Sequence, residues 1–174
     1  MAQPTINQAD GFSAGALHRP MPPDVRSAMA AFYDQVDTDV AARRPVCQVS
    51  GRCCRFEEYG HRLYVTTLEL QYFADVQLPA APSPAFVPNA APGLALPLYQ
   101  PDGQFRPGCP FQVKGLCTAR QARPLGCRIY FCDASSQDWQ NEVYERYHRR
   151  LIELHTSRGT PYHYREWRQA LALL

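Results

Sequence analysis

The sequence lacks the features that would assign it to a membrane or to the secretory route. Its 174 residues contain no run of about 18 apolar residues, so the sequence predicts no membrane-spanning helix. The segment from Met1 to Gly15 has neither a basic stretch nor an apolar one, and it does not resemble a secretory signal. We therefore expect a cytoplasmic protein without a membrane partner, in a compartment that keeps thiols reduced.

Charge of one sign and catalytic motifs are scarce as well. The formal net charge of +2 is too small to indicate a nucleic-acid partner. The sequence has no glycine-rich phosphate loop, no G-x-S-x-G and no H-E-x-x-H. A catalytic thiol would need a histidine close to it in space, which a sequence cannot locate. No catalytic residue is identified, and the questions of enzymatic activity and of a protein partner stay open.

Proline is abundant, and it divides the chain. There are 16 prolines, about twice the usual share of ~5%, and nine of them fall between Pro79 and Pro110. Because proline excludes helix interiors and central strands, we predict a proline-rich loop over 79–108. Residues 1–22 are polar, small or proline and predict a flexible N-terminal arm. The remaining residues, 23–174, fit one domain.

Hydrophobic spacing predicts a mainly α-helical fold with a short β element. A first helix begins at Asp24 and ends before Pro45, with one apolar stripe at three- and four-residue spacing. A strand is expected over 61–66, followed by a short helix to about Phe73 that is capped by Thr66 and Glu69. A long helix is predicted over 137–157, and a last amphipathic segment over 164–174. His148 and His155 on the long helix are interpreted as packing or helix-terminus residues.

Cysteine is the one residue type that indicates a chemistry. The seven cysteines fall into two groups, separated by the strand, the capped helix and the proline-rich loop. The neighbours of these cysteines are Gly, Arg, Pro and other cysteines rather than Val, Leu and Ile, so we expect them in irregular loops as ligands and not as core filler. All seven are candidate metal ligands: Cys47, Cys53, Cys54, Cys109, Cys117, Cys127 and Cys132.

Metal binding is the preferred explanation because thiolates brought together without a cation repel one another. Disulfides are disfavoured, since seven is an odd number and no secretory signal is present. Unrelated buried thiols are disfavoured because the cysteines cluster. The spacing leaves the metal open: Cys127-x₄-Cys132 suits zinc, whereas Cys109-Pro110 is also familiar from iron–sulfur proteins.

The ordered motifs resemble a known family. They are Cys47-x-x-Ser50-x-x-Cys53-Cys54, Cys109-Pro110-Phe111, Gly115-x-Cys117, Arg123-Pro124-x-x-Cys127-Arg128 and Cys132. Together they closely resemble the YkgJ-like cysteine-cluster family, a zinc- or iron-chelating domain of C-x-x-C-x-x-C-C type. The resemblance covers about residues 45–133 and implies metal chelation by these cysteines, with no settled activity.

One position departs from that family pattern. Ser50 stands where the second cysteine of the motif would be, so an arrangement of eight thiolates around two zinc ions lacks one ligand. His61 is the nearest substitute, although an ordinary histidine at a strand edge is the preferred interpretation. We expect the ligands to include Cys54, Cys109, Cys127 and Cys132 above the others.

The sequence thus predicts a small, metal-stabilised single domain, mainly α, with irregular cysteine-bearing loops. Its predicted function is chelation of zinc or iron by clustered thiolates. The alternative is an iron–sulfur protein that acts in electron transfer or as a component of a redox enzyme.

Overall fold

The computed structural model describes residues 20–78 and 108–174. The fold is mainly helical with a few short strands, as the sequence predicted. Most of the predicted arm and proline-rich loop, at 1–19 and 79–107, lies outside the described residues. Within the described ranges, no helix is long and apolar enough to cross a bilayer.

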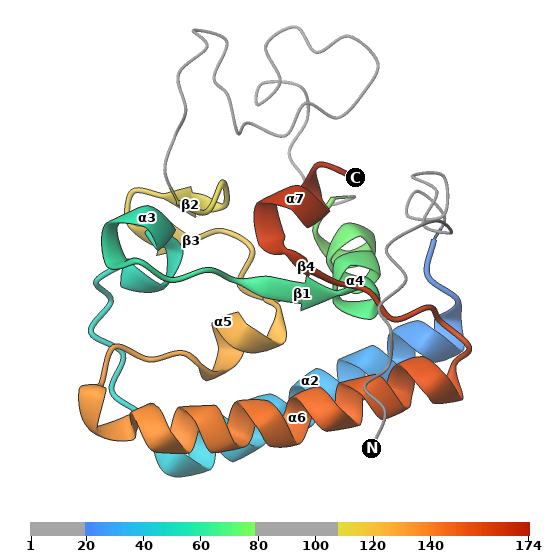
Figure 1. The fold of residues 1–174 in the computed structure, drawn as a ribbon, viewed down its shortest axis with the longest axis horizontal. Helices are drawn as coiled ribbons and strands as arrows, with labels where there is room; N and C mark the ends of the chain where they lie inside the picture. Colours follow the sequence, from blue (N-terminus) through green and yellow to red (C-terminus); the bar gives the residue numbers. More distant parts are fainter. Residues whose placement is uncertain (1–19, 79–107) are drawn as a thin grey trace, which may run out of the picture.

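Two long helices form one layer of the fold, at the bottom of Figure 1. They are α2 (Pro23–Arg43) and α6 (Gln137–Ser157), each of 21 residues. Phe32 of α2 packs edge-on against Tyr147 of α6, with ring centroids 5.8 Å apart. The Tyr147 hydroxyl donates to Asp39 Oδ2 at 2.7 Å, which ties the two helices together at their surface.

The apolar stripe predicted for the first helix is confirmed. Its six residues are all buried: Val25, Met29, Phe32, Tyr33, Val36 and Val40. The helix begins at Pro23 with Pro22 as N-cap and no side-chain cap, so the expected cap at Asp24 is wrong. Met21, which the sequence placed in the arm, is buried, and its backbone N–H donates to Asp75 Oδ1.

The second layer holds the short elements above these helices (Figure 1). Strand β1 (Tyr64–Thr66) pairs antiparallel with β4 (Tyr164–Glu166), and each strand leads directly into a helix. The helix α4 (Thr67–Gln77) begins with the predicted capping box, in which Glu69 bonds the Thr66 backbone N–H at 2.7 Å. The helix α7 (Trp167–Leu171) packs Trp167 against Phe73 of α4, with centroids 4.8 Å apart.

The cysteine loops are more ordered than the sequence indicated. The first contains the 3₁₀ turn η1 (Arg52–Cys54) and the short helix α3 (Phe56–Tyr59). The second contains a hairpin, β2 (Gln112–Val113) with β3 (Leu116–Cys117), then α5 (Leu125–Ile129) and the turn η3 (Ala134–Ser136). Cys127 therefore lies on a helix of five residues, which is too short for periodicity to reveal.

Arg128 fixes α5 against the long helices. Its side chain is only 5% exposed, and it donates to Asp37 Oδ2 at 2.5 Å and to the backbone carbonyls of Gln121 and Arg123. The guanidinium also lies 4.0 Å from the centroid of the Tyr33 ring. A buried cation with this many partners fixes the position of the helix that carries Cys127.

Candidate metal centre

Backbone contacts hold the two cysteine segments against each other. The Cys109 N–H donates to the Cys54 carbonyl at 2.7 Å, and the Gln112 side-chain amide donates to the Gly51 carbonyl at 2.8 Å. Gly108 has φ +95°, and a Cβ added there would lie 2.6 Å from the Cys54 oxygen. Glycine is therefore required at 108 for both its conformation and its close approach.

Five of the seven cysteines come together, and we call them the inner thiols: Cys53, Cys54, Cys109, Cys117 and Cys127. Cys54, which is buried, is at their centre. Its Sγ lies 4.0 Å from that of Cys53, and the side chains of Cys109 and Cys117 lie close enough to raise its pKa. Residues 53 and 117 are far apart in the sequence, so the fold itself assembles this group.

The inner thiols differ in their affinity for protons. The hydrogen bonds to Cys109, Cys117 and Cys53 raise the pKa of Cys54, which keeps the proton that it donates. The same bonds lower the pKa of Cys53 to about 7 and that of Cys117 to about 6, and they lower the pKa of Cys109. Burial raises the pKa of Cys127, and the charges of Cys109, Cys117 and Cys53 raise it further.

Several N–H groups point at the sulfur atoms. The backbone N–H of Phe111 acts to lower the pKa of Cys109, and that of Ala119 acts to lower the pKa of Cys117. In each case the donor lies two residues after the cysteine. The indole N–H of Trp167 is buried without a hydrogen-bond partner, and it lies near enough to Cys109 to lower the pKa of that thiol. Hydrogen bonds of this kind stabilise thiolates and are typical of the surroundings of metal-bound sulfur.

Arg123 supplies positive charge beside the inner thiols. Its Nε donates to the Arg120 carbonyl at 3.2 Å, and its Nη1 donates to the Cys127 carbonyl at 3.4 Å. Its charge acts to lower the pKa of Cys53, Cys117 and Cys127. Arg123 thus supplies positive charge that stabilises the thiolate form of these three residues.

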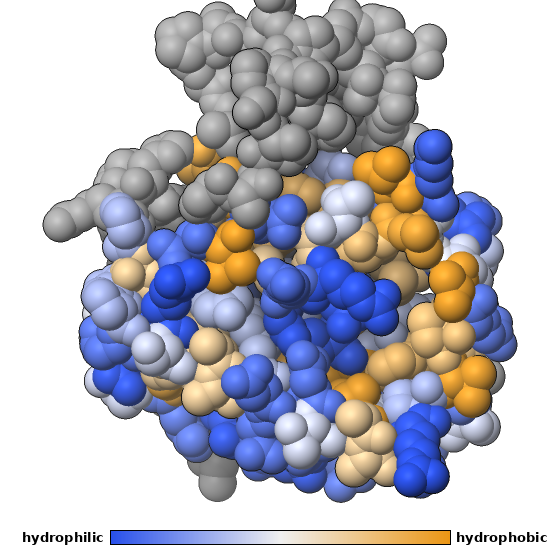
Figure 2. All heavy atoms as spheres, turned by 180° about the vertical axis from the view of Figure 1, so that it is seen from behind, coloured by the Kyte–Doolittle hydropathy of each residue, from blue (hydrophilic) through white to orange (hydrophobic). Residues whose placement is uncertain are grey.

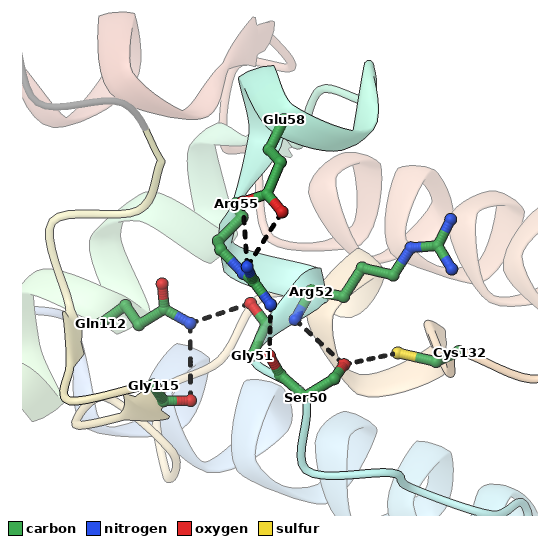
Figure 3. Close-up of polar contacts among 8 residues, drawn as sticks. All are labelled: Ser50, Gly51, Arg52, Arg55, Glu58, Gln112, Gly115 and Cys132. Atoms are coloured by element: carbon green, nitrogen blue, oxygen red, sulfur yellow. Dashed lines mark hydrogen bonds and ion pairs between the residues drawn. The ribbon is translucent and has the colours of Figure 1, made fainter.

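The other two cysteines lie apart from the inner thiols. The Cys132 Sγ lies 3.3 Å from the Ser50 hydroxyl, which also accepts from the Arg52 backbone N–H at 3.3 Å (Figure 3). Cys47 is exposed and makes no contact with another cysteine in the described residues. The seven candidate ligands thus divide into five that converge and two that do not.

All seven cysteines are free thiols. Across the described parts of the chain, no group of three or more His, Cys, Asp or Glu side chains is arranged so that it could hold a metal ion. Thiolates are donors that suit zinc and iron, but the sulfurs of the inner thiols do not form a coordination shell in this structure.

The histidines do not complete a ligand set. His61 stacks on Tyr130 with ring centroids 5.4 Å apart, and its Nε2 lies 3.3 Å from the Cys53 carbonyl rather than from a thiol. His155 is buried on α6, and His148 lies 2.9 Å from the Tyr162 hydroxyl, so both are packing residues as predicted.

Sequence reasoning missed the backbone donors at Phe111 and Ala119, and it treated Trp167 only as part of an apolar stripe. A signal for the donors existed in the chain, since each lies two residues after a cysteine, but the local backbone conformation was not foreseen.

No protein-family description matches the chain, and no curated protein or solved structure matches it. The likeness to the YkgJ-like family stays a prediction that depends on the quoted motifs.

Proposed function

We propose that this protein binds zinc or iron through its inner thiols. The observation that carries the proposal is the convergence of Cys53 and Cys54 with Cys109, Cys117 and Cys127, from two distant segments joined backbone to backbone. Five thiols gathered for packing alone would not need N–H donors aimed at their sulfurs. Thiolate is the form that binds metal, and Phe111 and Ala119 stabilise that form.

The protons shared among the inner thiols support the same proposal. Cys54 keeps its one proton, which it can donate to one neighbouring sulfur at a time and so reduce the repulsion between charged sulfurs at close range. A bound cation would do this more effectively, because it attracts every thiolate at once. Four of the five thiols would suffice for one tetrahedral zinc or one iron–sulfur cluster.

The role of the metal depends on its identity. A zinc ion would join the two cysteine segments and contribute folding energy of about 10 kcal/mol. An iron–sulfur cluster would supply one-electron chemistry and make the protein an electron carrier or a redox-enzyme component. In either case seven free thiols call for a reducing compartment, and we place the protein in the cytoplasm.

The test is elemental analysis for zinc, iron and acid-labile sulfide on protein purified without oxygen. We expect about one zinc, or iron with matching sulfide, per chain. The double variant Cys54→Ser/Cys109→Ser, which leaves three inner thiols, should lose the metal, whereas the matched variant Cys47→Ser should retain it, since Cys47 is exposed and apart from the inner thiols. Circular dichroism on each variant shows whether the helices are intact.

Four outcomes decide the matter. Zinc without sulfide favours the structural role, and iron with sulfide favours the redox role. Absence of both metals, in protein whose thiols are still reduced, overturns the proposal. Equal metal content in Cys54→Ser/Cys109→Ser and wild type, both folded, overturns the assignment to the inner thiols.

A further inference from the structure

A cavity of about 270 Å³ opens beside the inner thiols. Three parts of the chain enclose it: the segment from α3 to β1, the helix α5, and the first two turns of α6, which meet in the left half of Figure 1. Its volume is close to the lower end of the ~300–1,000 Å³ of small-molecule sites. Cys53 and Cys127 form part of its wall, so a molecule in the cavity would touch two inner thiols.

The lining of the cavity combines apolar walls with a few polar groups. Phe56, Tyr130 and Tyr144 supply aromatic surface, and the Asn141 and Gln137 amides reach it from α6. Binding sites for small organic molecules have this composition: largely apolar, with a few polar groups that fix orientation. A site for a bare inorganic ion would lack such apolar walls.

Apart from the thiols, the charged side chain that lines the cavity is a cation. Its lining residues include Arg62 and no aspartate or glutamate. Arg62 is exposed and forms no ion pair with any residue of 20–78 or 108–174. The start of the 21-residue α6 adds the positive end of a long helix dipole on the same side. An anionic group is therefore the complement that this site lacks.

We propose that this cavity binds a small organic carboxylate, with the carboxylate at Arg62 and the carbon body against the tyrosines. The inference goes beyond metal binding and does not require it. A carboxylate bound in the cavity would also lie next to Cys53 and Cys127, and therefore next to any metal that these two thiols bind.

The test compares benzoate with benzamide, which has nearly the same shape but no charge, by calorimetric titration of the protein as purified. A charge-assisted hydrogen bond is worth enough to make benzoate bind about tenfold tighter than benzamide. Arg62→Gln should abolish that preference. Arg149→Gln, which removes an exposed arginine of α6 outside the cavity, should preserve it.

A second variant tests the cavity itself. Asn141→Trp fills the space from an exposed helix position, and it should abolish binding of both probes while the protein stays folded. The proposal is overturned if benzoate and benzamide bind equally to wild type, if neither binds at millimolar concentration, or if Arg62→Gln keeps the preference. Metal content is measured on the same samples, so failure of metal binding and failure of carboxylate binding are separate results.

Discussion

The sharpest test of how the two cysteine segments join is the substitution Gly108→Ala. At φ +95° an L side chain is strained, and the added Cβ would lie 2.6 Å from the Cys54 carbonyl oxygen, a backbone atom that cannot rotate away. The strain costs about 1–2 kcal/mol, and overpacking a tight contact costs about 1–3 kcal/mol more. We therefore expect Gly108→Ala to lower the free energy of unfolding by about 2–5 kcal/mol.

Gly60→Ala is the matched control. Gly60 also has positive φ, at +66°, but a Cβ added there meets nothing within 4 Å. Gly60→Ala should lower the free energy of unfolding by the strain alone, about 1–2 kcal/mol. The difference between the two variants isolates the contact between residues 108 and 54.

The assay is urea unfolding followed by circular dichroism, together with metal content per chain. Gly108→Ala should unfold at lower urea than Gly60→Ala, and it alone should lose metal, because the clash displaces Cys54 from Cys109. Equal losses of stability in the two variants, with equal metal content, would refute the reasoning. The segments would then not meet as closely as the structure shows.

Three further predictions concern the framework around the site. Arg128→Met should lower the free energy of unfolding, measured with urea, by about 2–4 kcal/mol, because two backbone carbonyls lose a buried donor. Arg146→Met, which removes a surface ion pair, should lower it by less than about 1 kcal/mol. Burial lowers the pKa of His155, so near pH 6.5 the unfolded chain takes up a proton that the folded chain does not. The free energy of unfolding should therefore be full above that pH and fall on acidification, and it should fall less steeply in His155→Leu. An unchanged pH profile in that variant would contradict this origin. Ser50→Cys should form a disulfide with Cys132 on oxidation, since the Ser50 hydroxyl and the Cys132 sulfur are 3.3 Å apart. Peptide mapping that pairs the new thiol with one of the inner thiols would show that the placement of residue 50 beside Cys132 is wrong.

The long helices could be predicted because their cores repeat at helical spacing. Each of α2 and α6 presents a buried stripe that a periodicity of 3.6 reveals, and the capping box at Thr66 and Glu69 is a local signal. The strand at 164–166 was missed, because three residues carry too little pattern and its partner β1 is about 100 residues away. Such pairing is a property of the whole fold.

The β2–β3 hairpin shows a second reason for failure. Its turn is Lys114-Gly115, with φ of +50° and +80°, a two-residue turn that sequences usually mark with Asn-Gly or Asp-Gly. Lysine at the first position conceals the turn, although Gly115 permits it. The same turn brings Gln112 opposite Cys117. The geometry of the second cysteine segment therefore depends on a turn of which only the second residue, Gly115, is typical.

The candidate ligands could be identified from the sequence, but their division could not. Spacing grouped Cys53 with Cys54 and Cys127 with Cys132, yet the structure places Cys127 among the inner thiols and Cys132 beside Ser50. Four residues separate Cys127 from Cys132 along the chain; Cys127 lies on α5, and Cys132 follows the end of that helix. Which side of such a short helix a thiol faces is decided by its packing, here by the burial of Arg128 and Ile129.

This division gives the departure at Ser50 a defined consequence. Because the serine contacts Cys132 and not the inner thiols, it removes a sulfur from the outer position and leaves the five converging donors complete. A motif that lost a cysteine among the inner thiols would weaken the group that we propose to share one ion. The loss at position 50 instead weakens a second site, where Cys132 would be left with a hydroxyl that is a poor ligand at neutral pH. Metal binding by this chain is therefore expected at one centre, and a stoichiometry of two ions per chain would require donors that the outer position does not offer.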